Sequence, residues 1–175
     1  ANEGIIYAYS LAIASDDVPY VSYTDSSFSD AGTVVSFDSV SWVPVGSAGF
    51  SEAGARNIAL TLDSNDRPYV AYTDNSHLDA LTVMRYDGAS WEIVGASGFS
   101  AGEAQYASIA LDSDNTPYVA FLDIEGGSIP AVMKYSGSAW VTVGNVGFSG
   151  VSSGGMELRI NASNTPYIAY LDQDN

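Results

Sequence analysis

The chain has 175 residues, 46% of them hydrophobic, and 21 acidic against five basic side chains give it a formal net charge of −16. This length fits one domain with a sizeable core, and the composition is typical of a globular chain. A negative field of this size repels phosphate groups, the chain has no cysteine, and no apolar run reaches the roughly 18 residues of a membrane helix, so we expect no nucleic-acid binding, thiol chemistry or membrane insertion.

One segment recurs four times along the chain, at residues 18–25, 67–74, 116–123 and 165–172. Its prolines stand at positions 19, 68, 117 and 166, so the period is 49 residues. Two further markers keep the same step, a tryptophan at 42, 91 and 140 and a Gly-Phe-Ser triplet that starts at 49, 98 and 147. The sequence therefore predicts a repeat protein.

Each repeat is expected to form four short strands separated by turns. In the third repeat the strands are predicted at 108–112, 117–123, 131–135 and 139–143, with a variable loop at 124–130. The proline is tolerated because it stands at the first position of its strand. Short β-rich runs separated by Gly, Asn, Asp and Ser are typical of antiparallel hairpins.

The second strand of each repeat indicates how the sheets pack. Tyr118, Ala120 and Leu122 point to one face, and Val119 and Phe121 point to the other. Both faces are apolar, so the strand must be covered on both sides. Four-stranded antiparallel blades packed face to face around an axis meet this requirement, which predicts an all-β fold, a β-propeller. An open solenoid or sandwich is the competing solution.

Residues 109–120, with the sequence IALDSDNTPYVA, resemble the inner two strands of NHL-type and related bacterial β-propeller repeats. In that family a pattern of I-A-V-D, D-G-N and Y-V-A recurs. The strand from Trp140 to Gly144 resembles the outer strand of the same unit. The resemblance implies a propeller fold and no activity.

The blades are predicted at about 9–46, 58–95 and 107–144, followed by a half blade at 156–172. Propeller rings close with about four to eight blades. The chain is therefore either a segment of a longer propeller, which we favour, or a partial ring completed by another copy. Each chain has one more first strand than third strand, so a second copy would not complete the half blade in the usual order. Either way we expect self-association through the open edges, with a homodimer as one form.

Most aromatic residues fall in columns at the repeat spacing and are expected to pack between blades. Tyr7, Tyr9, Phe28 and Tyr106 break this pattern. The columns of Tyr7 and Tyr106 immediately precede the innermost strand, so they should line the mouth of the central channel. The candidate ligand site comprises Tyr7, Arg56, Asn57, Gln105 and Tyr106, joined by loop residues Phe28, Asp30, His77, Asp79 and Glu125. An ordinary polar loop surface is the alternative.

The carboxylates that end the second strands, Asp25, Asp74, Asp123 and Asp172, suggest either a metal ring or, as we favour, acceptors for backbone N–H groups in the next loop. Asp63, Asp112 and Asp114 are weak calcium candidates. Their turns lack the Gly and distant Glu of an EF-hand, and a hairpin explains them without a metal. No other cofactor is expected.

Catalytic motifs are sparse in the sequence. His77 is the only histidine, and no glycine-rich phosphate loop occurs. A glycosidase needs only two carboxylates, so that class stays open.

The sequence favours a non-catalytic binding module that recognises a glycan or a protein through one loop face. A purely structural or self-assembling repeat is the alternative, followed by a carboxylate-based hydrolase. The acidic composition and a start at Ala1 without methionine favour an extracellular or cell-surface protein, although an excised fragment would begin in the same way.

Overall fold

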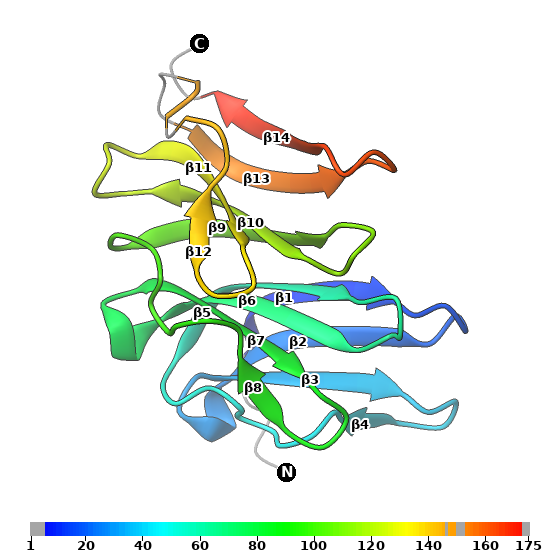
Figure 1. The fold of residues 1–175 in the computed structure, drawn as a ribbon. Helices are drawn as coiled ribbons and strands as arrows, with labels where there is room; N and C mark the ends of the chain where they lie inside the picture. The colour runs from blue at the N-terminus through cyan, green and yellow to red at the C-terminus, as the bar shows by residue number, and fades with distance from the viewer. Residues whose placement is uncertain (1–5, 146, 150–152, 173–175) are drawn as a thin grey trace.

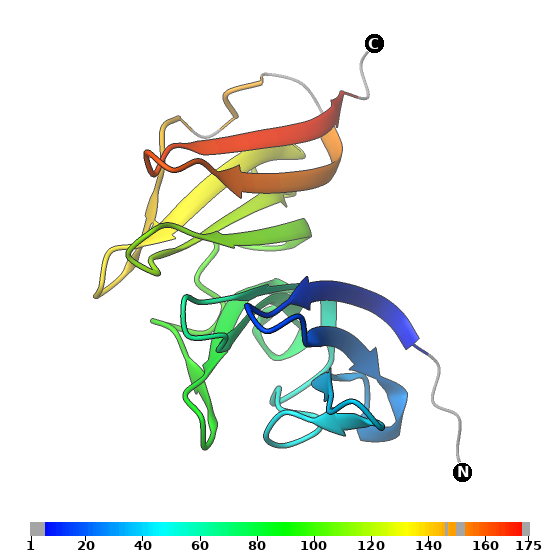
Figure 2. The same cartoon turned by 90° about the vertical axis from the view of Figure 1, so that its right-hand side faces the viewer.

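The computed structural model describes residues 6–145, 147–149 and 153–172, and these residues form an all-β structure. Three sheets each have four antiparallel strands in sequence order, and a fourth sheet has two. We call them blade 1 (β1 to β4), blade 2 (β5 to β8), blade 3 (β9 to β12) and the half blade (β13 and β14). Blade 1 lies at one end of the stack and the half blade at the other (Figures 1 and 2).

The strands keep the repeat in their lengths and positions. The first strands are β1 (Ile6–Ile13), β5 (Ala55–Leu62), β9 (Ala104–Leu111) and β13 (Ser153–Ile160). The second strands begin at the repeat prolines and are β2 (Pro19–Asp25), β6 (Pro68–Asp74), β10 (Pro117–Asp123) and β14 (Pro166–Asp172). The third strands are β3 (Ala31–Phe37), β7 (Ala80–Tyr86) and β11 (Ile129–Tyr135). The fourth are β4 (Trp42–Pro44), β8 (Trp91–Ile93) and β12 (Trp140–Thr142). Two 3₁₀ turns, η1 (Ser26–Phe28) and η2 (Asn75–His77), follow β2 and β6.

The first strands form the inner ring of the stack. β1 lies beside β5, β5 beside β9, and β9 beside β13. Hydrogen bonds join these strands: Ser10 Oγ accepts from Leu60 N at 3.1 Å, and Ser108 Oγ accepts from Leu158 N at 3.0 Å. Four-stranded sheets that meet at their first strands around an axis make a β-propeller, so the predicted fold is confirmed.

The second strand of blade 3 is buried on both faces, as its apolar pattern predicts. Val119 and Phe121 belong to the cluster that blade 3 shares with blade 2. Tyr118 and Ala120 pack on the opposite face with Leu158 of the half blade. The core is thus a series of layers between blades rather than one central core.

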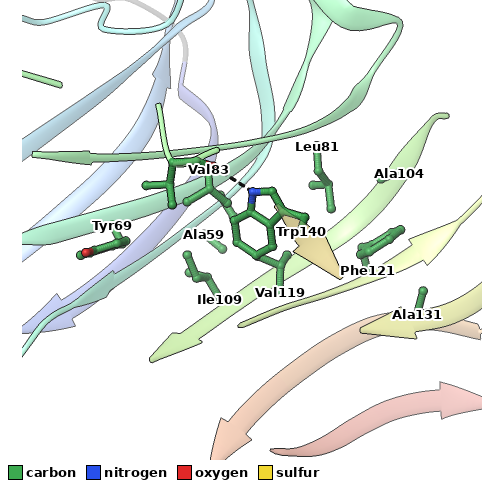
Figure 3. Packing of buried hydrophobic residues seen from close by; sticks show 12 residues of the cluster. Ala59, Tyr69, Leu81, Val83, Ala104, Ile109, Val119, Phe121, Ala131 and Trp140 are labelled. Carbon is green, nitrogen blue, oxygen red and sulfur yellow. Dashed lines mark hydrogen bonds between the residues drawn. The ribbon is translucent and has the colours of Figure 1, made fainter. Parts of the chain in front are cut away.

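In blades 2 and 3 a tryptophan of the fourth strand fastens the blade to the one before it. The indole Nε1 of Trp140 donates to the carbonyl oxygen of Val94 in blade 2 at 2.8 Å (Figure 3). Its ring stacks on Phe99 with centroids 4.2 Å apart. Trp91 stacks on Phe50 of blade 1 in the same way, at 4.3 Å. The tryptophan and Gly-Phe-Ser columns therefore form one inter-blade device.

A second set of bonds joins the turns between first and second strands. Each uses a side chain with a left-handed φ close to 60°, Asp66, Asn115 or Asn164, which reaches back to the preceding blade. Asp66 Oδ1 accepts from Ser15 N at 2.8 Å, and Asn115 Oδ1 accepts from Ser64 N at 2.9 Å. These bonds fix the relative position of neighbouring blades at the end opposite the 3₁₀ turns.

The exposure of the tryptophans leads to a stability prediction. Trp140 is 9% exposed, whereas Trp42, which has no described blade in front of it, is 49% exposed. Trp140→Ala should lower the free energy of unfolding by about 3–5 kcal/mol because it empties a buried stack and leaves the Val94 carbonyl unpaired. Trp42→Ala, the matched control, should cost clearly less. Urea unfolding measures both, and equal losses would contradict this account of the inter-blade device.

Candidate functional site

Asn57 and Tyr106 lie at a bulge inside the inner strands. The sequence predicted that they precede the innermost strand, but β5 and β9 begin earlier because pairing continues beyond a shift in register. At the shift Asn57 has φ +46° and Tyr106 has φ +52°, both left-handed, and Gly155 takes φ +54° in the half blade. Only glycine adopts this region freely, and a bulky side chain there costs on the order of 1–2 kcal/mol.

The bulge residues line a hollow of about 380 Å³ between the first strands, which we call the channel mouth. All four inner strands contribute to it, and its lining residues are Tyr9, Asn57, Ile58, Tyr106, Ala107, Gly155 and Met156. Tyr9 and Tyr106 are exposed, while Asn57 is half-buried and its Nδ2 donates to Thr73 Oγ1 at 3.4 Å. Two aromatic rings and one amide therefore converge on the hollow.

The other residues of the predicted rim lie outside this hollow. Arg56 and Gln105 stand next to the bulge residues but do not line it. Gln105 Nε2 donates to Glu103 Oε1 at 2.8 Å, which draws its amide to its own strand. The Tyr7 side chain lies outside the part of the chain that the structure describes.

Phe28 and His77 occupy the same position at the ends of η1 and η2. Each packs on the glycine of a Gly-Phe-Ser triplet: a Cβ added to Gly49 would come within 2.7 Å of Phe28 Cβ, and one on Gly98 within 2.6 Å of His77 Cβ. They share the channel-mouth end of the blades, since β6 ends where β5 begins, but the hollow does not include them.

The remaining loop residues anchor the chain between blades. The backbone carbonyl of Asp30 accepts from Ala55 N at 2.8 Å, and that of Asp79 accepts from Ala104 N at 3.0 Å. Asp79 Oδ1 is buried and has no hydrogen-bond partner among the described residues. Glu125 packs closely against Gly102. These contacts give Asp30, Asp79 and Glu125 positions in the scaffold, away from the hollow.

Three of the aspartates that end the second strands accept backbone N–H groups of the next loop, as we favoured over a metal ring. Asp25 Oδ1 accepts from Ser27 N at 2.9 Å, Asp74 Oδ1 from Ser76 N at 3.0 Å, and Asp123 Oδ1 from Gly126 N at 2.9 Å. Because each caps the loop beside it, the column shapes the loop face of the propeller.

The weak calcium candidates stand in hairpin turns. Asp63 Oδ1 accepts from Asn65 N and Arg67 N, and Asp112 Oδ1 accepts from the backbone N–H groups of Asp114 and Thr116. Across residues 6–145, 147–149 and 153–172, no group of three or more His, Cys, Asp or Glu side chains could hold a metal ion. Calcium binding at these aspartates stays a prediction.

Asp74 is the buried member of its column. Burial alone would raise its pKa, but hydrogen bonds from the hydroxyls of Ser76 and Thr82 and from Ser76 N, together with the nearby His77, hold the pKa below its usual value. Thr82 Oγ1 donates to Asp74 Oδ2 at 2.9 Å, and His77 Nδ1 lies 3.1 Å from the same oxygen. The carboxylate is thus the hub of the loop that carries His77.

The depressed pKa of Asp74 makes stability depend on pH. Its contribution is present above the unfolded pKa of about 3.9 and is lost as the pH falls through the lower folded value. Asp74→Asn should lower the free energy of unfolding at neutral pH by about 1–3 kcal/mol and reduce the loss of stability below pH ~4. Thr82→Val, which removes one donor, should change the profile in the same sense by less. Urea unfolding across this pH range tests it, and an unaltered profile in Asp74→Asn would contradict the assignment.

Two features of this surface were not in the predicted site. Tyr9 was recognised as an aromatic that breaks the repeat but was left out, although it forms one wall of the hollow. A larger cavity between blades 2 and 3 was also missed, because the residues that line it come from several repeat columns and stand together only in the folded stack.

Comparison with known proteins supports the fold. No protein-family model matches the chain and no curated protein matches its sequence, so the resemblance to NHL-type repeats stays a prediction. A fucose lectin from Kordia zhangzhouensis, solved with methyl-fucoside, is 14% identical with a TM-score of 0.53, and 79% of this chain covers 99% of the lectin.

Two enzymes also have similar structures. An ulvan lyase of a polysaccharide-lyase family is 14% identical, with a TM-score of 0.60, and 90% of this chain covers 43% of it. An endo-arabinase from Bacteroides thetaiotaomicron is 12% identical, with a TM-score of 0.54, and 94% of this chain covers 68% of it. The chain thus spans nearly the whole lectin but less than half of the lyase. At these identities the similarity shows the fold.

Proposed function

We propose that this chain is a non-catalytic β-propeller binding module that holds a glycan at the mouth of its central channel. The observation that carries the proposal is the pair of left-handed residues, Asn57 and Tyr106, which stand at bulges and line one hollow. Bulges commonly re-aim side chains next to functional sites, and backbone strain persists where function requires it.

The chemistry of the hollow suits a saccharide. Tyr9 and Tyr106 offer ring faces for the C–H surface of a sugar and phenol groups for its hydroxyls, and Asn57 offers both a donor and an acceptor. The similar proteins include a lectin and enzymes that act on polysaccharides, which favours a glycan over a protein as ligand. A protein ligand stays the second candidate for the same face.

The hollow favours binding over hydrolysis. A glycosidase of the common type needs two carboxyl groups beside the scissile bond. None of the described residues that line the hollow carries a carboxylate. Glu157 stands on the adjacent inner wall, where it is exposed and paired with Arg159. Glycan binding also agrees with the proposed extracellular or cell-surface location, and no helix in the described residues is long and apolar enough to cross a membrane.

Tyr106→Gly separates the proposed function from stability. Glycine removes the cost of the left-handed φ, so the free energy of unfolding should stay unchanged or rise by about 0.5–1 kcal/mol. Glycan binding should fall at least tenfold because one wall of the hollow is gone. A glycan array identifies the ligand, and titration calorimetry with urea unfolding measures both effects.

Phe28→Ala is the control, since it removes an aromatic ring from the same face outside the hollow. It should leave glycan affinity unchanged. The proposal fails if Tyr106→Gly binds like the wild type, and the strain account fails if this substitution destabilises the protein.

We also propose that the two open ends of the stack associate with further blades, supplied by another copy or by a longer chain. Leu11 in blade 1 is 63% exposed, whereas Leu60 at the same repeat position is 7% exposed. At the other end Tyr167 is 60% exposed, whereas Tyr118 is 6% exposed. Exposed apolar faces of this kind mark interaction surfaces.

This proposal predicts that the chain in isolation associates in a concentration-dependent way. Leu11→Ser should weaken association because it places a hydroxyl in the apolar face. Val40→Ser also replaces an apolar side chain with a hydroxyl, but on an exposed turn, so it should leave the association unchanged. Analytical ultracentrifugation measures the association. A wild-type chain that stays monomeric at every concentration would contradict the proposal and would mean that the end blades are stable with their outer faces exposed.

A further inference from the structure

We propose that the cleft between blades 2 and 3 is a second saccharide site, with a neutral, polyhydroxylated sugar ring as its ligand. This inference takes its ligand class from the proposed function but uses none of the residues at the channel mouth. The cleft has a volume of about 520 Å³, larger than the hollow at the channel mouth. That volume lies within the usual range for small-molecule sites.

The cleft is built from both blades. Blade 2 contributes Tyr69, Arg85 and Val94, and blade 3 contributes two turns together with Tyr118, Lys134 and Tyr135. Tyr69 and Tyr118 are buried, so they form the floor rather than the rim. Ligand pockets usually have an apolar floor surrounded by a few polar side-chain groups.

Two of the five basic residues in this acidic chain stand on the cleft. Arg85 and Lys134 share one repeat column, in which blade 1 has Ser36, so only the cleft between blades 2 and 3 has a cation from each blade. Lys134 Nζ lies 5.8 Å from the ring centre of Tyr118, and no described carboxylate forms an ion pair with it. An ammonium without a carboxylate partner, in a chain with 21 acidic residues, remains a donor for a ligand.

The opposite side of the cleft is held in place by the inter-blade bonds. Asn115 Oδ1 accepts from Ser64 N at 2.9 Å and its Nδ2 donates to Ser64 Oγ at 2.9 Å, so both ends of the amide bind the preceding blade. Asp112 Oδ1 is fixed by the N–H groups of Asp114 and Thr116. The turn that borders the cleft is therefore ordered before any ligand arrives, which lowers the entropic cost of binding.

The mixture of groups identifies the ligand class. Lys134 only donates hydrogen bonds, as do the N–H groups of Arg85 that its ion pair with Glu92 (3.2 Å) leaves over. The carboxylates of Asp112 and Asp114 only accept them, and the tyrosine phenols do both. A sugar hydroxyl also donates and accepts, so adjacent hydroxyls match such a lining. An anionic group would face two carboxylates as well as two cations and the net charge of the chain, which favours a neutral ring.

The test is an NMR titration of the isotope-labelled protein with methyl-fucoside, xylotriose, arabinotriose and, as an anionic arm, glucuronic acid. A neutral saccharide should shift the backbone amides of Asn115, Ser136 and Gly137, which border the cleft. Lys134→Ala and Arg85→Ala should each weaken this binding at least fivefold. Arg67→Ala, the charge-matched control outside the cleft, should leave it unchanged.

Tyr106→Gly distinguishes this site from the channel mouth. It should remove shifts at Asn57 and Gly155 and preserve those at Asn115 and Gly137. Cleft amides that do not move with any neutral saccharide, or that move only with glucuronic acid, would overturn the proposal. If the wild-type protein shows saccharide-induced shifts at the cleft amides but none at the channel mouth, the proposed function fails and the cleft site remains supported.

Discussion

The contact between the tryptophan of one blade and the phenylalanine of the preceding blade is the interaction on which the structure depends. In Trp140 it combines a parallel stack on Phe99, with rings 8° apart, and an indole hydrogen bond to the Val94 carbonyl. The turn that brings this carbonyl into place needs Gly95, whose φ is +85° and where a Cβ would come within 3.0 Å of the indole nitrogen. Since the indole hydrogen bond joins residues 46 apart, this contact converts the sequence repeat into a stack of blades.

The same geometry places the candidate sites. Fixing the blades against one another brings the first strands together, and their bulges then face a common axis. A cleft also lies between blades 2 and 3. The channel-mouth site uses residues that vary between repeats, whereas the cleft combines the repeated tyrosines Tyr69 and Tyr118 with a variable column that holds Arg85 and Lys134. This division agrees with the general finding that function is carried by individual sites on a shared fold.

The sequence predicted the fold well because packing requirements repeat. The period of 49 residues, the two-faced pattern of 117–123 and the tryptophan column each express a contact that every blade must make. The candidate site was predicted less completely. Tyr106 was recognised as a departure from the repeat, and Asn57 was named beside it as a candidate site residue. The bulge that turns both inward leaves no signal in the periodicity of the side chains. Tyr9 was left out because its partners come from other blades, and the cleft of Arg85 and Lys134 arises only when two blades pack.

The most direct test of the central claim is a crystal structure of the protein with the saccharide that a glycan array selects. The account predicts an intact saccharide at the channel mouth, with its ring against Tyr106 or Tyr9 and a hydroxyl within hydrogen-bond distance of the Asn57 amide. A saccharide bound only at other surfaces, or found cleaved between two carboxylates, would contradict the account.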